Sequence, residues 1–97
     1  MFIDDERFPA TEGWVIVRSS SFAIDTVKQL GMPSVISFDH DLGGNDTSRV
    51  FILWLLDELA DSRISFPENF EFKVHSQNPI GAAWIQGTME NLVREFS

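Results

Sequence analysis

Residues 35–41 read VISFDHD, and this stretch decides the fold. Residues 35–38 form a short, mostly apolar run, which is typical of a buried strand when turn signals bound it. Asp39, His40 and Asp41 follow at once, so the strand delivers two carboxylates and an imidazole at its carboxyl end. Ligand sites of open α/β sheets lie outside the carboxyl ends of the strands. The stretch therefore predicts a sheet strand with a polar site at its end.

The rest of the chain alternates between strand and helix patterns. Runs rich in β-branched and aromatic residues predict strands at 1–3, 14–18 and 70–75. Apolar residues at helical spacing predict helices at 21–31, 47–62 and 80–96. The order β–β–α–β–α–β–α implies a mostly parallel sheet with helical crossovers. No repeat or linker appears, so we expect one α/β domain over residues 1–97.

Each predicted helix has a start signal. Ser20 or Ser21 is expected to cap the first helix, and one of residues 46–48 is expected to cap the second. Asn78-Pro79 favours the start of the third helix, because Asn caps well and Pro fits the first helical position.

Composition excludes several classes of protein. The chain has 97 residues, 43% of them hydrophobic, which is enough for one core, and it has no cysteine for a disulfide or a thiolate site. The longest apolar run, residues 50–56, is too short to span a bilayer, so we expect no membrane segment, no signal peptide and a cytoplasmic location. Seven basic against 15 acidic residues, a net charge of −8, disfavour non-specific binding to nucleic-acid backbones. The charge also allows an acidic inhibitory protein that imitates DNA.

Polar residues gather after three of the four predicted strands. They are Asp4, Asp5 and Arg7 after the first, Asp39, His40 and Asp41 after the third, and His75, Ser76 and Asn78 after the fourth. Carboxylates crowded in one crevice repel one another unless a cation intervenes, and oxygen ligands favour Mg²⁺ or Mn²⁺. Two helix N-termini expected at the same edge suit a phosphate. The pattern predicts a site that handles phosphate with a metal ion.

Roles follow from the residue types. Asp4, Asp5, Asp39 and Asp41 are the candidate metal ligands, His40 and His75 the candidate base and acid, and Arg7, Ser76 and Asn78 the candidate phosphate ligands. Each also has a structural interpretation. Asp5, Asp41 and Arg7 could be solvated surface charges, Asn78 a helix cap, Ser76 a partner of strand-end backbone groups, and each histidine a satisfied core residue.

These residues resemble the receiver domain of response regulators. An acidic pair follows the first strand, and Asp39 ends the third strand before a Leu-Gly-Gly loop. The resemblance implies that Asp4 and Asp5 bind a metal ion, that Asp39 is the phosphoacceptor position and that Ser76 is the Ser/Thr switch position.

A fuller string is similar to the cyclic-phosphate-processing receiver-like family. It comprises Ile3 to Arg7, Trp14 to Ser19, Ser37 to Gly43 and Val74 to Pro79, with Asp-His-Asp-Leu-Gly and His-Ser-x-Asn-Pro as the distinctive parts. This resemblance implies a small receiver-like (flavodoxin-like) fold of two or three layers, with a sheet of order 2-1-3-4. It also implies action on a cyclic phosphate of a nucleotide or an RNA end.

The chain departs from ordinary receivers. No helix is expected between the first two strands, and the fifth strand, its terminal Lys and the last helix are missing, since Lys28 and Lys73 lie elsewhere. The absence of that Lys weakens a phosphorelay function, whereas His40 and His75 favour acid–base chemistry. The leading prediction is a metal-dependent phosphoesterase, with Asp39 in its catalytic set. The alternative is a non-catalytic receiver-like signalling or nucleotide-binding module.

The missing helices predict an uncovered sheet face. Right-handed crossovers put the helices at 21–31 and 47–62 on one side of the sheet. The inner strands carry apolar residues toward both faces, which must be buried. Either the C-terminal helix crosses under the sheet, or a second subunit covers the vacated side. The helix at 47–62 is apolar beyond one face, so we expect a homodimer.

Overall fold

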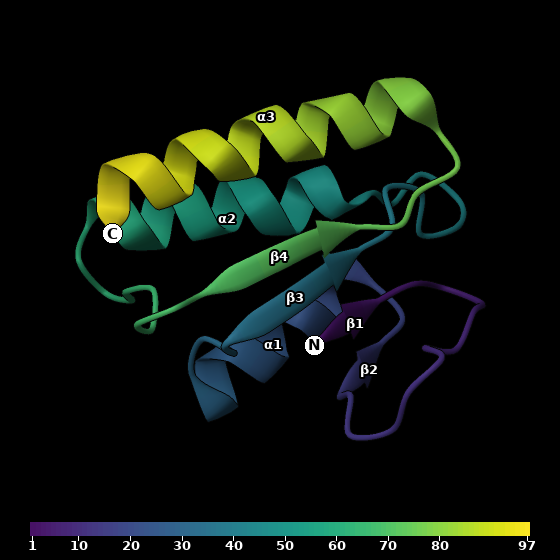
Figure 1. Cartoon of the computed structure of the whole chain (residues 1–97), viewed down its shortest axis with the longest axis horizontal. Coiled ribbons are helices and arrows are strands. Elements are labelled where there is room, and N and C mark those ends of the chain that lie inside the picture. Colours follow the sequence, from purple (N-terminus) through teal and green to yellow (C-terminus); the bar gives the residue numbers. More distant parts are fainter.

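Strand β3 (Val35–Phe38) lies inside a four-stranded sheet in the computed structural model, which describes residues 1–97 (Figure 1). It pairs with β1 (Phe2–Ile3) on one side and β4 (Glu71–Val74) on the other, and β2 (Ile16–Val17) pairs with β1. All pairs are parallel, and the order is β2-β1-β3-β4. The receiver-like α/β fold and the strand order expected from the sequence are confirmed.

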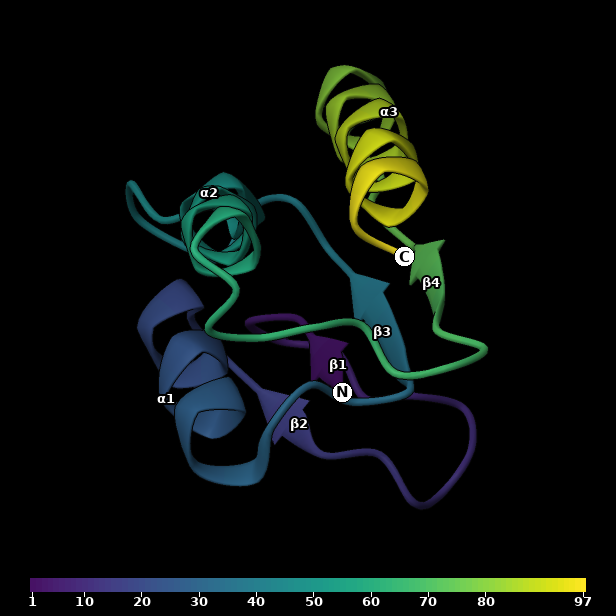
Figure 2. The same ribbon diagram turned by 90° about the vertical axis from the view of Figure 1, so that its left-hand side faces the viewer.

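Three helices cover one face of this sheet, which makes the fold two-layered (Figure 2). They are α1 (Ser20–Leu30), α2 (Ser48–Ala60) and α3 (Pro79–Phe96). Helix α2 packs between α1 and α3, and α3 also packs on β4. The C-terminal helix therefore does not cross under the sheet. The first of the two arrangements expected from the sequence is wrong.

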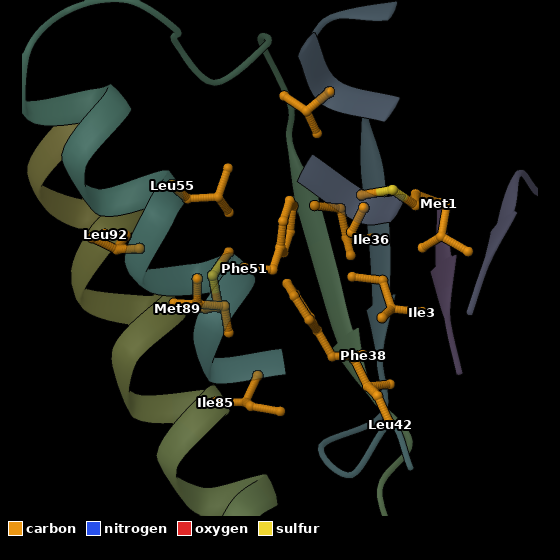
Figure 3. Close-up of a cluster of buried hydrophobic side chains, with 14 of the residues drawn as sticks. Met1, Ile3, Ile36, Phe38, Leu42, Phe51, Leu55, Ile85, Met89 and Leu92 are labelled. Carbon is orange, nitrogen blue, oxygen red and sulfur yellow. The ribbon is translucent and has the colours of Figure 1, made fainter. Parts of the chain in front are cut away.

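The pleat of the sheet divides its residues between the two faces. Residues paired across parallel strands point to the same side, and the pairs join Ile3, Val17, Phe38 and Val74. This side faces the helices and carries the core. In Figure 3, Phe51 and Leu55 of α2 and Ile85, Met89 and Leu92 of α3 point toward Ile36 and Phe38 of the sheet.

The opposite face carries Phe2, Ile16, Ser37 and Lys73, which the strand pairing places together. No helix lies on this side; the loop between β1 and β2 passes over it (Figure 2). Trp14 of that loop meets the Phe2 ring edge-on at 6.0 Å, and Phe2 stacks on His75 at 4.5 Å. Phe2 is therefore buried without a second subunit.

Helix boundaries follow side-chain caps. Asn78 caps α3 and Thr47 caps α2, as expected, but α1 is capped by Ser19, whose hydroxyl accepts from Phe22 N–H at 3.1 Å. Ser20 is instead buried inside the helix and donates its N–H to Asp46 at 2.8 Å. The Ser20 hydroxyl also donates to Asp46, which lies 26 residues away. The expected cap at Ser20 or Ser21 was wrong because this long-range contact takes Ser20 into the helix.

Two elements are shorter than expected. The strand expected at 14–18 is regular only over β2, although Val15 still accepts a backbone hydrogen bond from Phe2 N–H at 2.8 Å. Helix α2 ends at Ala60, shortly before Ser62, which has a left-handed φ of 58° that a helix cannot continue. No helix combines the length and the apolarity needed to cross a membrane.

Candidate functional site

A cavity of about 440 Å³ opens where β1, β3 and β4 end. No apolar side chain lines it; its lining residues are Asp4, Asp5, Glu6, Arg7, Asp39, Asp41, Gly43, Ser76, Gln77 and Asn78. Parallel strands bring their carboxyl ends to one edge, which explains why segments 71 residues apart meet here. Seven of the nine residues singled out from the sequence line this cavity, and the two histidines do not.

Three of the carboxylates form a compact cluster. Asp4, Asp5 and Asp39 each offer one oxygen, and these oxygens lie within 4.8 Å of one another. Asp41 lines the cavity but lies outside the cluster. Gly43 has a φ of 88°, and a Cβ built there would come within 3.3 Å of Asp5 Oδ2, so the loop backbone lies close against this carboxylate. The cluster is the part of the site that fits a divalent cation.

Asp4 is the buried member of the cluster, with a side chain 1% exposed. Its Oδ1 accepts from the N–H groups of Glu6 at 2.9 Å and Arg7 at 2.8 Å, and its Oδ2 accepts from Arg7 Nε at 2.9 Å and His75 Nε2 at 3.0 Å. Burial alone would raise the pKa of Asp4, but these hydrogen bonds and the charge of Arg7 outweigh burial and lower it. A carboxylate offers about four lone-pair sites, so Asp4 is saturated.

His75 lies beneath Asp4 on the helix-free face of the sheet. Its Nε2 faces Asp4, and its Nδ1 lies 2.7 Å from Ser37 Oγ. Because a carboxylate only accepts, the neutral ring carries its proton on Nε2, and Nδ1 accepts from the Ser37 hydroxyl. The ring stacks on Phe2, nearly parallel at 5°. His75 therefore holds Asp4 in place from the helix-free face of the sheet and does not line the cavity.

His40 is likewise turned away from the cavity and is 6% exposed. Arg49 Nε donates to its Nε2 at 2.9 Å, so the ring carries its proton on Nδ1 and donates to Asp41 Oδ1 at 3.0 Å. The guanidinium of Arg49 lies 4.7 Å from the centre of the Trp84 ring. His40 thus ties the end of β3 to α2 and α3, and both of its nitrogens have partners.

Asp41 is held from two sides at the rim of the cavity. Asn78 Nδ2 donates to its Oδ2 at 3.2 Å, while His40 bonds its Oδ1. The hydrogen bond from His40, followed by that from Asn78, lowers the pKa of Asp41 below its ordinary value. Asn78 also caps α3 by accepting from Gly81 N–H at 3.0 Å, and Ser76 Oγ accepts from Asn78 N–H at 3.1 Å. Asn78 and Ser76 thus have structural partners as well as a place in the cavity wall.

Arg7 is the cation of the cavity. Its Nε lies 2.9 Å from Asp4 Oδ2 and its Nη2 lies 3.3 Å from Asp39 Oδ2, so one guanidinium bridges two strand ends. Asp39 also accepts from His40 N–H at 2.9 Å through Oδ1. The sequence left Arg7 open between a surface charge and a phosphate ligand. The structure shows it paired with two carboxylates, and its phosphate role stays a prediction.

Behind the cavity wall, the supporting residues that were not singled out from the sequence include Ser37, Arg49, Gly81 and Trp84. Ser37 could have been recognised from the sequence, because it is a polar residue in an otherwise apolar strand. Gly81 carried a weaker signal, a glycine in the first turn of a helix; a Cβ there would lie 2.7 Å from His40 Cδ2. Arg49 and Trp84 lie at ordinary helix positions, and nothing local in the sequence marks them.

The fold and the site together define a receiver-like domain: a parallel sheet of order 2-1-3-4 with an acidic pair after β1 and a third Asp after β3. The family model described as Cyclic-phosphate processing Receiver domain matches residues 1–91, and the chain belongs to this family. No curated protein and no solved structure matches the chain.

Proposed function

We propose that this domain is a metal-dependent phosphoesterase that opens a cyclic phosphate of a nucleotide or an RNA end. The carboxylate cluster carries the proposal: three Asp side chains and one Arg share a wholly polar cavity at the carboxyl ends of three strands. A cavity without apolar lining suits a charged ligand such as a phosphate. The family description, cyclic-phosphate processing, supports this ligand class.

Asp5 and Asp39, together with Asp4, would hold Mg²⁺ or Mn²⁺, because hard oxygen donors suit these ions. When bound, such an ion supplies Lewis-acid polarisation of a phosphoryl oxygen. The three carboxylates and Arg7 carry a formal charge of −2 together, which one divalent ion neutralises. The residues of the cluster therefore fit the ion.

The remaining cavity residues bind and orient the phosphate. Arg7 supplies a planar donor that matches a phosphate, and Asn78 presents the N-terminal end of α3 to the cavity, where a helix dipole favours an anion. The backbone N–H groups of Arg7 and Glu6, together with His75, lower the pKa of Asp4, and His75 also holds its side chain in place. Asp41 is kept in place by His40. A direct role of either imidazole as acid or base remains a prediction.

One observation favours a second candidate, a nucleotide- or phosphoryl-binding module without turnover. Neither histidine lines the cavity, so no imidazole stands ready to donate or accept a proton there. Such a module would bind the same ligands through the same residues. Product formation separates the two candidates, because binding alone leaves the ring closed.

The decisive experiment incubates the protein with Mg²⁺ or Mn²⁺ and a panel of 2′,3′- and 3′,5′-cyclic nucleotides, followed by chromatography of ring-opened products. We expect ring opening that chelation with EDTA abolishes. Asp39→Asn should lose metal binding by calorimetry and lose product. Asp25→Asn, the same change at an exposed position of α1, is the matched control and should retain both. Metal and nucleotide binding without any product would favour the second candidate.

We further propose that the domain forms a homodimer. Val50, Leu53 and Leu56 of α2 are 49%, 51% and 36% exposed, so the apolar excess of this helix reaches the surface as expected. The loop over the helix-free face of the sheet covers Phe2, whereas these three side chains of α2, at helical spacing, are left uncovered. Light scattering at micromolar concentration tests the dimer, and a mass near 11.0 kDa would contradict it.

A further inference from the structure

We infer that Arg7 is the resident counter-cation of the carboxylate cluster and that a divalent ion must displace it to bind. The inference rests on the proposed function only in assuming a divalent-cation site at Asp4, Asp5 and Asp39. It adds that the guanidinium sets the affinity of this site and becomes available to an anionic ligand once displaced.

The Arg7 guanidinium lies between the ends of two strands. Arg7 joins Asp4 and Asp39, which end strands β1 and β3, through contacts of 2.9 and 3.3 Å. These are two of the three carboxylates whose oxygens lie close enough together to share one ion. The guanidinium therefore bonds two of the three carboxylates that a divalent ion would need.

The Asp4 carboxylate has no free lone pair for a metal ion while Arg7 is bound to it. All four of its lone-pair sites have donors, and a metal ion cannot use an oxygen that two N–H groups already occupy. Two donors are backbone groups of the loop after β1. The third, His75, is stacked on Phe2 and bonded to Ser37. The Arg7 side chain, 44% exposed, is the donor that can leave without a change in the fold.

The backbone of Arg7 is held by hydrogen bonds on both sides. Its N–H bonds Asp4 at 2.8 Å, and its carbonyl oxygen accepts from Arg18 Nη1 at 2.6 Å. The same Arg18 nitrogen bonds the Asp4 carbonyl at 3.0 Å, and the guanidinium of Arg18 lies 4.7 Å from the Phe8 ring centre. Because this backbone is fixed, the side chain can rotate about its own bonds between the carboxylates and the open cavity.

A quantitative consequence follows from charge. Without Arg7 the three carboxylates would carry −3, and with it they carry −2. A divalent ion and a guanidinium about 5 Å apart repel one another enough, even at a water-like dielectric, to weaken metal binding on the order of tenfold. Removal of the guanidinium should therefore tighten metal binding by about that factor.

The test is calorimetric titration of the folded, metal-free protein with MnCl₂, followed by the same titration of Arg7→Gln and Arg7→Lys. We expect Arg7→Gln to bind Mn²⁺ on the order of tenfold more tightly, and Arg7→Lys, which keeps the charge, to stay within about threefold of the parent. Arg94→Gln makes the same change of charge near the far end of α3 and should shift the affinity less than twofold. Circular dichroism in EDTA verifies that each variant is folded.

The outcomes separate the two ideas. Unchanged or weaker Mn²⁺ binding by folded Arg7→Gln would overturn the counter-cation role while leaving a metal site in place. If Arg7→Gln does not fold, Arg7→Lys gives the answer. Mn²⁺ binding by Arg7→Lys that is as much as tenfold tighter than in the parent would overturn the counter-cation role, because the retained positive charge should still compete with Mn²⁺. Absence of Mn²⁺ binding in every variant would overturn the proposed metal-dependent function itself.

Discussion

Gly81→Ala tests the place of His40 in the structure. A Cβ at Gly81 would lie 2.7 Å from Cδ2 and 2.8 Å from Nδ1 of His40, closer than any ordinary contact. The imidazole cannot yield freely, because its two nitrogens bond Asp41 and Arg49 and it is 6% exposed. The added methyl group must therefore push the ring off at least one partner.

The expected cost follows from these contacts. Overpacking of this kind costs about 1–3 kcal/mol, and each disturbed hydrogen bond adds about 1 kcal/mol. Ala in place of Gly in a helix returns at most about 1 kcal/mol. We expect Gly81→Ala to lower the free energy of unfolding by about 1–3 kcal/mol, which for a domain of this size lowers Tm by about 4–8 °C per kcal/mol.

The matched control is Gly87→Ala in the same helix. Nothing lies within 4 Å of a Cβ at Gly87, so this variant should gain about 0.5–1 kcal/mol. Urea denaturation followed by circular dichroism measures both variants. A His40→Ala background removes the clash, and Gly81→Ala should then be neutral or stabilising. Equal stabilisation by Gly81→Ala and Gly87→Ala in the parent protein would refute the packing argument.

Three further predictions concern the cavity carboxylates and their partners. His75→Ala should lower the free energy of unfolding by about 2–4 kcal/mol, since it removes a hydrogen bond to an ionised carboxylate and leaves Ser37 unpaired; a urea midpoint within error of the parent would contradict this. The pKa of Asp4 is lowered by folding, so its stabilising contribution is present above about pH 4 and is lost as the pH falls through the lower value of the folded state. Asp4→Asn should accordingly show a smaller drop in stability between pH 6 and pH 3 than the parent, and an equal drop would argue against Asp4. Asn78→Ala should cost about 1 kcal/mol through the lost cap, with a larger loss expected than for Asn91→Ala near the other end of α3.

The sequence by itself determined the elements and the edge at which the site lies. A buried strand ending in Asp39 and a first strand ending in Asp4 and Asp5 are local patterns, and parallel strands must bring such ends together. The caps at Thr47 and Asn78 are equally local, since each contact joins residues two or three positions apart. Strand order came from the resemblance to receivers, which the family match bears out.

Only the tertiary structure decided where the polar side chains point. The sequence could not show that His75 hydrogen-bonds Ser37, 38 residues away. Nor could it show that His40 hydrogen-bonds Arg49 on the next helix. It also could not show that the Arg7 guanidinium pairs with Asp39, which ends another strand. The face covered by α3 was also undetermined, because one apolar stripe fits either side of a sheet. These outcomes depend on contacts between distant segments, and no periodicity or spacing within a segment records them.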